Sequence, residues 1–402
     1  MSNASSDCEV IIAGGGPVGL CLALLLSRAG VSVRVFEAEP AISLDLRAST
    51  FHPPTLDMLE PFGVTADLVA RGLVCPHWQI RLHPDGDRAV FDLSVLSGET
   101  RHPYRLQCEQ WKLSESLLAH LQKEGKAQVV FGASVTQATQ DETGASVTVE
   151  TAAGAQTHRA KFVVGADGAR SFVRKAMELP FEGETYPETT LLVTTLFPFE
   201  EHLEGLSNVT YCWKKDGNFS LLKVPGRWRV SIYPREDLSI EEQLSEEMIE
   251  ASLQDIVPRA QAYEVNEKRP YRVHQRIVDK YNKGRLVLAG DAAHLNSPSG
   301  GMGLNGGVHD AFELAAALVD MLRHGAPLER LDLYDRKRRP IARDQIIAQA
   351  DRNRARMREK DPEKRREMLA DLQAIVNDRQ RLHAYLLRSS MIEGLRQSQA
   401  IT

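Results

Sequence analysis

The hydrophobic and polar positions near the N-terminus predict a strand, a turn, a helix and a second strand. Val10 to Ala13 is a short apolar run, and the apolar positions of Leu20 to Arg28 recur at the spacing of a helix. Val31 to Phe36 is rich in β-branched residues, which favour strands. We therefore expect a βαβ unit, with a glycine-rich turn between its first strand and its helix.

A different pattern occupies the middle of the chain. His77 to Leu82 and Ala89 to Leu93 alternate around a Pro84-Asp85-Gly86-Asp87 turn, which predicts a hairpin. Between Leu191 and Pro234, four β-rich segments separated by glycine-containing turns indicate an antiparallel sheet. Other predicted helices are one beginning near Pro54, then Gln110–Gln122, Ile240–Ile256 and Gly307–Arg323, and other predicted strands are Val129–Phe131, Ser146–Glu150, Lys161–Val164 and Arg285–Ala289.

Beyond Pro327 the chain becomes strongly charged and helical in pattern. Thirteen of the twenty residues from Asp351 to Ala370 are charged, eight of them basic and five acidic. Asp361 followed by Pro362 predicts a helix start, because the carboxylate can accept bonds from the first amides and proline suits the first turn. The mixed signs favour solvated helical faces with ion pairs over a nucleic-acid-binding patch.

Composition and charge narrow the class of protein. A chain of 402 residues with 43% hydrophobic content is typical of a globular protein with two or three domains. The formal net charge of -5 gives no general attraction to nucleic acid or to an anionic membrane. Five scattered cysteines without a CxxC pair favour reduced thiols and no metal site, and no signal sequence or membrane span is visible, so we expect a cytoplasmic protein.

The turn of the βαβ unit carries the first candidate chemistry. It has the pattern Gly-x-Gly-x-x-Gly and contains Gly14, Gly16, Pro17, Val18 and Gly19. Such glycines let the backbone approach a pyrophosphate at the positive end of a helix. Glu37, followed by Ala38 at the end of the second strand, can accept a hydrogen bond from a ribose 2′-hydroxyl and would repel a 2′-phosphate. The pattern predicts a site for FAD or NAD, the alternative being glycines that serve only the turn's steric needs.

Two further glycine-rich segments follow predicted strands. The first contains Gly165-Ala166-Asp167-Gly168, and the second runs from Gly290-Asp291 to Leu304-Asn305. Each places an aspartate, Asp167 or Asp291, at the mouth of a strand, where it can bind a polyol hydroxyl or the amides of a helix end. The nearby glycines let backbone amides meet a flat ring, which favours FAD over NAD.

In this order and spacing the three motifs resemble those of the single-component, class A flavoprotein monooxygenases, typified by para-hydroxybenzoate hydroxylase and phenol hydroxylase. The resemblance covers about residues 8 to 330. With the pattern of elements it predicts an α/β fold containing a Rossmann-like FAD-binding domain, an inserted antiparallel β substrate domain and a helical C-terminal segment. The expected ranges are 1–72, 97–180 and 270–330 for the FAD-binding domain, 73–96 and 181–269 for the substrate domain, and 331–402 for the helical segment.

The resemblance also implies roles for individual residues. Asp291 would bind the ribityl chain of FAD, and Asp167 belongs to a motif implicated in binding both FAD and the reduced nicotinamide. The backbone amides around Gly301, Gly303, Leu304 and Asn305 would line the pyrimidine side of the flavin. Arg47 would lie near the FAD phosphates and act in catalysis, and Gln107 would lie on the FAD side. For both of these residues a solvated surface position is the alternative.

The implied reaction is oxygenation of an aromatic ring. NAD(P)H reduces FAD, O2 adds at flavin C4a, and the hydroperoxide transfers one oxygen atom to an electron-rich ring while the other leaves as water. NADH or NADPH would bind transiently, because the chain has no second nicotinamide motif. A Baeyer–Villiger or epoxidising reaction and a non-catalytic FAD-binding protein are the alternatives, and a flavin halogenase is disfavoured because its Trp-x-Trp-x-Ile-Pro motif is absent. The chain leaves no room for the thioredoxin-like domain of larger phenol hydroxylases, and we expect a monomer or homodimer.

Residues near the substrate are harder to predict. His52 could act as a general base on a phenol or could cap the next helix. His294, three residues after Asp291, could tune the flavin site or bond to a helix start. Pro298 lies in a segment that approaches the substrate in this family, or it simply shapes its loop. Period-two alternation places four pocket candidates on strand faces where they could instead be core: Tyr211, Trp213, Arg229 and Tyr233.

Overall fold

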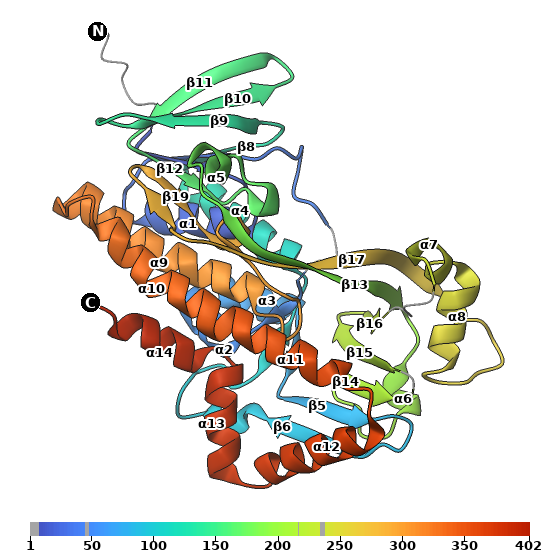
Figure 1. Ribbon diagram of the computed structural model, residues 1–402. Coiled ribbons are helices and arrows are strands. Elements are labelled where there is room, and N and C mark those ends of the chain that lie inside the picture. Colours follow the sequence, from blue (N-terminus) through green and yellow to red (C-terminus); the bar gives the residue numbers. More distant parts are fainter. Residues whose placement is uncertain (1–7, 45–47, 216, 234–237) are drawn as a thin grey trace.

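The computed structural model describes residues 8–44, 48–215, 217–233 and 238–402. In the described residues, six strands form a sheet in the order β18-β19-β12-β1-β2-β8, parallel except at β18 (Figure 1). Its strands β1 and β12 are wholly buried, as expected where both faces of a parallel sheet are covered. The bounds are β1 Val10–Ala13, β2 Val33–Phe36, β8 Ala127–Val130, β12 Phe162–Gly165, β18 Asn282–Lys283 and β19 Leu286–Leu288.

Helix α1 (Pro17–Arg28) packs against α4 (Gln110–Glu124) and α9 (Gly303–His324) beside this sheet. A three-stranded antiparallel sheet contributes to the same core, although the sequence pattern predicted only its middle strand. Its strands are β9 Ser134–Gln140, β10 Ala145–Thr151 and β11 Gly154–Ala160, and short helices α2 Pro53–Leu59, α3 Val64–Arg71 and α5 Phe172–Ala176 complete this part.

A second three-stranded sheet, in the order β3-β7-β4, has two different faces. Its strands are β3 (Thr50–Phe51), β4 (Leu73–Cys75) and β7 (Arg105–Gln107). Phe51 and Leu106 point into the core of the parallel sheet. Because side chains alternate along a strand, Arg105 and Gln107 point the opposite way.

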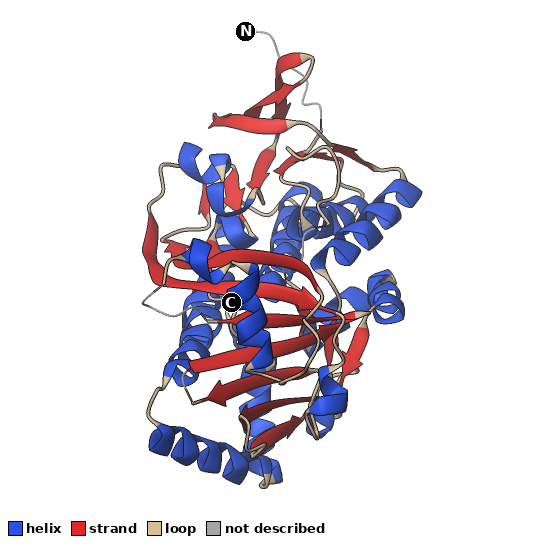
Figure 2. Ribbon diagram, turned by 90° about the vertical axis from the view of Figure 1, so that its right-hand side faces the viewer, coloured by secondary structure: helices blue, strands red, loops and turns tan. Residues whose placement is uncertain are grey.

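The largest sheet has eight strands in the order β20-β17-β13-β16-β15-β14-β5-β6, antiparallel except between β14 and β5. Figure 2 shows its strands side by side in the lower half of the molecule. One face is apolar and packs against α6 and α8, whereas the opposite face carries the polar Ser220, Arg229 and Ser231. The bounds are β5 His77–Leu82, β6 Arg88–Asp92, β13 Phe181–Thr195, β14 Val209–Lys214, β15 Gly217–Val224, β16 Arg227–Ile232, β17 Val265–Val278, β20 His294–Leu295, α6 Phe199–His202, α7 Ile240–Gln243 and α8 Glu246–Gln254.

The C-terminal segment is helical, as predicted, and crosses the molecule from the parallel sheet to the β5–β6 hairpin (Figure 1). Asp361 caps α12 by accepting a bond from the Glu363 amide at 2.9 Å. Pro340 lies inside α10, and the helix passes into a π-helical stretch at Ala342–Ile347. The helices are α10 Arg330–Ile341, α11 Ala348–Arg358, α12 Pro362–Val376, α13 Arg379–Ser389 and α14 Ile392–Ala400. Among the described residues, no helix has the length and apolar character that a membrane span requires.

Candidate active site

The glycine-rich turn forms a cradle at the start of α1. Gly14 has φ of +101°, and a Cβ there would lie 2.3 Å from the Ala166 carbonyl oxygen. A Cβ on Gly19 would lie 2.0 Å from the Gly14 oxygen. These two glycines are therefore required by packing, whereas a Cβ on Gly16 would meet no atom within 4 Å. The open side of the turn lies at Gly16.

The first turn of α1 offers amides to an anion. Its N-cap residue, Gly16, has no capping side chain, Pro17 begins the helix, and no acidic residue stands in the first turn. A helix start of this kind leaves backbone N–H groups and the positive end of the helix dipole available. Val18 is partly exposed in this turn.

Glu37 fastens the turn to the end of β2. Its Oε2 accepts a hydrogen bond from the Gly15 amide at 2.5 Å, and its Oε1 accepts one from the Glu39 amide at 2.9 Å. The carboxylate remains partly exposed, and Ala38 beside it is exposed. The acidic group predicted to face a ribose therefore also shapes the glycine turn.

The two aspartates of the later motifs differ in their surroundings. Asp167 Oδ2 accepts bonds from the Phe172 and Val173 amides at 2.7 and 3.3 Å, so it binds the start of α5. Its Oδ1 is buried without a partner, and burial raises the pKa of this carboxyl group. Asp291 is exposed at the carboxyl end of β19, beside Gly290, whose φ is +61°.

A second uncapped helix start lies at Gly303 and Leu304, which begin α9 without a capping side chain or a first-turn acid. The preceding loop is held by Asn305, whose buried side chain donates to the Thr50 oxygen at 2.9 Å and to the Gly301 oxygen at 2.7 Å. Because this side chain is occupied, Asn305 can offer only its backbone to a flat ring. A Cβ on Gly301 would lie 2.7 Å from the Thr50 Cβ.

His52 holds the same loop. Its backbone amide donates to Asn305 Oδ1 at 2.9 Å, and its Nε2 donates to the Gly300 oxygen at 2.8 Å. Burial, together with the nearby charge of Arg105, lowers the pKa of His52 to about 3. The imidazole is therefore neutral and a poor proton acceptor near neutral pH. Although His52 occupies the N-cap position of α2, its side chain makes no capping bond.

Gln107 and Arg229 meet at Ser49, between the small and the large sheet. Gln107 Oε1 accepts a bond from Ser49 Oγ at 3.2 Å, and Gln107 Nε2 donates to Thr50 Oγ1 at 2.9 Å. Arg229 Nη1 donates to the same Ser49 Oγ at 2.7 Å. Burial and the neighbouring Arg269 lower the pKa of Arg229 to about 10. Arg47, the other predicted basic residue near FAD, lies outside the described residues.

The remaining substrate candidates occupy separate places. Tyr211 is partly buried on the polar face of the large sheet, with its ring 6.2 Å from that of Trp78. Trp213 is fully buried in a core with the C-terminal helices, where its Nε1 donates to the Arg356 oxygen at 3.1 Å. Trp213 therefore has the core position that was its alternative. Pro298 is exposed in the loop before α9.

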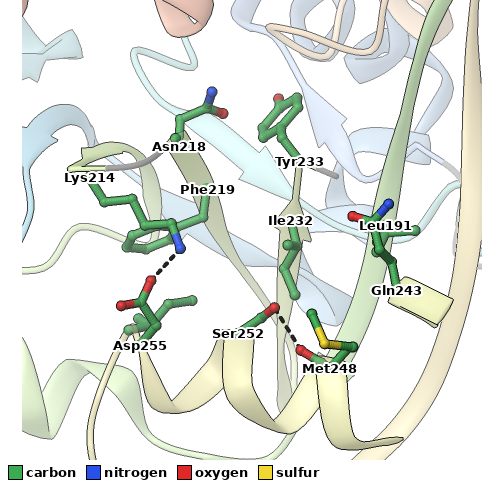
Figure 3. A pocket seen from close by; sticks show the side chains of 12 residues that line it. Leu191, Lys214, Asn218, Phe219, Ile232, Tyr233, Gln243, Met248, Ser252 and Asp255 are labelled. Atoms are coloured by element: carbon green, nitrogen blue, oxygen red, sulfur yellow. Dashed lines mark hydrogen bonds and ion pairs between the residues drawn. The ribbon is translucent and has the colours of Figure 1, made fainter. Parts of the chain in front are cut away.

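A cavity of about 470 Å³ lies between the apolar face of the large sheet and α8 (Figure 3). Leu191, Phe219 and Ile232 form its sheet side, and the ion pair of Lys214 with Asp255 stands at one end. Tyr233 lines it, and burial raises the pKa of this phenol to about 12. None of the glycines or aspartates of the three motifs belongs to this lining.

Sequence reasoning missed a buried charged network behind Gly290. Asp310 Oδ2 accepts bonds from the Gly290 amide at 3.1 Å and from His294 Nε2 at 2.8 Å, and its Oδ1 accepts one from Arg338 Nε at 2.7 Å. Burial raises the pKa of Asp310, but Arg338 and His294 outweigh it and lower the value to about 2. His294 thus helps to fix the turn that bears Asp291. The signal available in the sequence was Asp310 itself, an acidic residue among the apolar positions of the predicted helix.

The comparisons with known proteins agree with this geometry. A family model described as "FAD binding domain" matches residues 7–349. The chain is 35% identical over 393 residues to para-nitrophenol 4-monooxygenase of Pseudomonas sp. strain WBC-3, covering 96% of each chain. This protein is a class A FAD-dependent aromatic monooxygenase.

A second curated relative and a solved structure are also similar to this monooxygenase. It is 34% identical over 332 residues to 6-hydroxy-3-succinoylpyridine 3-monooxygenase of Pseudomonas putida, covering 82% of this chain and 84% of the relative. The crystal structure of p-nitrophenol 4-monooxygenase from Pseudomonas putida DLL-E4 superposes with a TM-score of 0.90 at 34% identity, covering 96% of this chain and 98% of that one. The monooxygenase fold thus extends over almost the whole chain, including the C-terminal helices.

The described residues of the monooxygenase fit FAD. The open side of Gly16 and the uncapped start of α1 suit a pyrophosphate, and the exposed Asp291 suits a hydroxylated chain. The uncapped start of α9 suits the polar edge of a flavin ring. These groups come from three segments that the fold brings to the carboxyl ends of β1 and β19.

Proposed function

We propose that the enzyme hydroxylates a phenol or a hydroxylated heteroaromatic ring with NAD(P)H as reductant and O2 as oxidant. One atom of O2 enters the ring as a hydroxyl group, the other leaves as water, and NAD(P)H and a proton are consumed to give NAD(P)+. When bound, FAD supplies the hydride acceptor and the activation of O2. The names of two relatives, acting on para-nitrophenol and on a hydroxypyridine, support this substrate class.

The observation that carries the proposal is the polar face of the large sheet, which meets the small sheet at Ser49. Arg229 on that face reaches Ser49, and Ser49 reaches Gln107. Gln107 also bonds to Thr50, which contacts Gly301 in the loop before α9. Tyr211, Ser220 and Ser231 are aligned across neighbouring strands of the same face. In this proposal, residues 73–96 and 181–269 bind the substrate, and residues 1–72, 97–180 and 270–330 bind FAD.

The roles of the chain's own residues follow from their bonds. Gly16 and the amides of α1 bind the FAD pyrophosphate, and Asp291 binds the ribityl hydroxyls. Asn305 and His52 keep the loop before α9 in place, so that its amides meet the ring. Arg47, which would lie near the FAD phosphates, and Pro298 in the exposed loop complete the proposed set. The hydroxyl groups of the sheet orient the substrate, while the surrounding core excludes water.

The test is substrate-stimulated turnover of the FAD-loaded enzyme. We would record NADH and NADPH oxidation and O2 uptake against a panel of phenols and hydroxypyridines, and determine product masses and structures. Stimulated oxidation with one added oxygen atom as a ring hydroxyl is the expected result. A ring-expanded or epoxide product would move the assignment to a Baeyer–Villiger or epoxidising enzyme. Bound FAD without stimulated oxidation by any of these compounds would contradict the proposed hydroxylase.

The cradle is tested separately by Gly16→Leu. Because a Cβ at Gly16 would meet no atom within 4 Å, this variant is expected to fold, and its side chain would occupy the space proposed for the pyrophosphate. We expect a large loss of flavin absorbance per mole of purified protein. Gly98→Leu is the matched control, since a Cβ on Gly98 also meets no atom within 4 Å. Equal flavin content in both variants would argue against the cradle.

A further inference from the structure

Arg105 is a buried cation without a counter-charge among the residues that the structure describes. Its side chain is among the buried polar groups, with 3% of the residue exposed. Within the described part of the chain, no Asp or Glu forms an ion pair with it, and its Nε has no hydrogen-bond partner. Burying an unpaired charge is costly, so a position of this kind is typical of a group that meets its counter-charge in a ligand.

The groups that surround Arg105 come from four elements. The guanidinium Cζ lies 4.6 Å from the centre of the Trp78 ring, on β5. Burial lowers the pKa of Arg105, and the phenols of Tyr211 and Tyr385 and the thiol of Cys75 only partly oppose this effect. An arginine still keeps its charge near neutral pH. We refer to Cys75, Trp78, Arg105, Tyr211 and Tyr385 as the Arg105 cluster.

The Arg105 cluster has aromatic walls. Trp78 stacks on Phe91 with ring centres 3.9 Å apart, and Phe91 stacks on Tyr385 at 5.0 Å. Tyr211 meets the edge of Trp78 at 6.2 Å. Flat walls around a cation suit a flat ligand that carries negative charge.

The cluster lies on the side of the small sheet that is connected to the loop before α9. Arg105 is two residues before Gln107 on β7, so the two side chains point to the same side of the small sheet. Gln107 bonds to Thr50, and Thr50 contacts Gly301 in the loop before α9. Ser49, which bonds to Gln107, also accepts a bond from Arg229, so this side of the small sheet faces the polar face of the large sheet.

The hydroxyl of Tyr385 comes from the C-terminal helical segment and is oriented by another cation. Arg356 Nη1 donates to Tyr385 Oη at 3.2 Å. A phenol that accepts this bond keeps its own proton for donation elsewhere. The polar groups facing Arg105 are thus hydroxyls and a thiol rather than carboxylates.

We propose that Arg105 binds the ionised oxygen of a phenolate substrate, with Tyr211 and Tyr385 as hydrogen-bond donors beside it. This inference rests on the proposed function, because it names the ionisation state in which the phenol binds. A phenolate ring is richer in electrons than the neutral phenol, so selecting the anion also selects the form that accepts an oxygen atom more readily. The bound anion supplies the counter-charge that the described residues do not.

The test uses the FAD-loaded enzyme and 4-nitrophenol, whose anion is distinguished from the neutral phenol by its visible absorption. We expect the bound compound to remain ionised at pH values below its pKa in free solution. Spectral titration of the wild-type complex against pH measures this shift directly. A pKa of the bound compound equal to or above the free value would overturn the proposal without any variant.

Variants then assign the effect to Arg105. Because a hydrogen bond to a charged group is worth about 1.5–3 kcal/mol, Arg105→Met should bind 4-nitrophenolate about 10- to 100-fold more weakly. Binding of 4-nitroanisole, which has the same ring but cannot ionise, should change by less than about three-fold. Arg105→Lys should restore part of the affinity for the anion. Arg101→Met removes an exposed arginine four residues away and should leave both affinities unchanged.

The outcomes separate this inference from the proposed function. Equal loss of 4-nitrophenol and 4-nitroanisole binding in Arg105→Met, or no loss of either, would overturn the role of Arg105 while leaving turnover by the wild type intact. If the wild type binds 4-nitrophenol as the anion with the predicted dependence on Arg105, but yields no oxygenated product, the inference stands and the proposed hydroxylation fails.

Discussion

Two buried arginines of this monooxygenase, Arg338 and Arg105, differ in whether a described carboxylate pairs with them. Both are almost inaccessible, with 1% and 3% exposed. Arg338 donates to Asp310 at 2.7 Å, whereas Arg105 faces phenols, an indole and a thiol. The comparison shows that burial of a charge does not by itself indicate function. Arg338 is compensated by Asp310, whereas Arg105 has no carboxylate partner among the described residues.

Each arginine has a buried neutral histidine near it. Burial, with the charge of Arg338, lowers the pKa of His309 to about 3, and burial, with the charge of Arg105, does the same for His52. His309 Nε2 is 3.0 Å from Thr55 Oγ1, and His52 Nε2 bonds to the Gly300 oxygen. The two sites are therefore similarly buried and each has a neutral histidine. They differ because a carboxylate, Asp310, is bonded to Arg338 but none of the described carboxylates is bonded to Arg105.

The largest expected effect comes from removing Arg338. Arg338→Met leaves the Asp310 carboxylate buried beside His294 without its strongest partner, so we expect the free energy of unfolding to fall by about 3–5 kcal/mol. Urea denaturation followed by far-ultraviolet circular dichroism measures the loss. Arg343→Met breaks an exposed pair with Asp344 and should cost less than about 1 kcal/mol. Similar losses in the two variants would show that the buried Asp310 network contributes no more to the free energy of unfolding than an exposed ion pair.

The histidines predict a dependence of stability on pH. The folded-state pKa of His309 and of His52 lies near 3, below the ordinary value of 6.5, so the unfolded chain binds protons first as the pH falls. The free energy of unfolding should therefore decrease below about pH 6.5, by up to about 1.4 kcal/mol per pH unit for each histidine.

His309→Gln isolates one of these contributions. The variant should show a slope of stability against pH that is shallower by about 1.4 kcal/mol per unit between about pH 6 and pH 4. Urea denaturation at a series of pH values gives both slopes. Parallel curves for wild type and variant would refute the neutral, buried state of His309.

The smallest effect is expected at Arg105 in the absence of a ligand. Because no carboxylate of the described residues loses a partner, Arg105→Met should change the free energy of unfolding by less than about 1 kcal/mol, or raise it. Thermal and urea denaturation of the ligand-free protein provide the measurement. A loss as large as that of Arg338→Met would reveal a structural role for Arg105 and remove the contrast between the two sites.

The sequence pattern predicted the elements whose buried residues recur at regular intervals along the chain. The βαβ unit, the β5–β6 hairpin and the long helix α9 have regular apolar spacing. Strand β17 was missed because its sequence, rich in Lys and Arg, has few buried positions and is held mainly by pairing with β13. The helix expected over Ile240–Ile256 divides into α7 and α8 because Ser245 caps a new start there.

The sequence by itself determined the flavin cradle, because the chemistry of a glycine turn at a helix start depends on backbone atoms a few residues apart. Tertiary structure decided which polar residues became partners. Asp310 meets Arg338 across 28 positions, and Ser49 meets Arg229 across 180. The counter-charge of a buried group is set by what the packed fold places within a few ångströms of it, and neighbours along the chain do not reveal that.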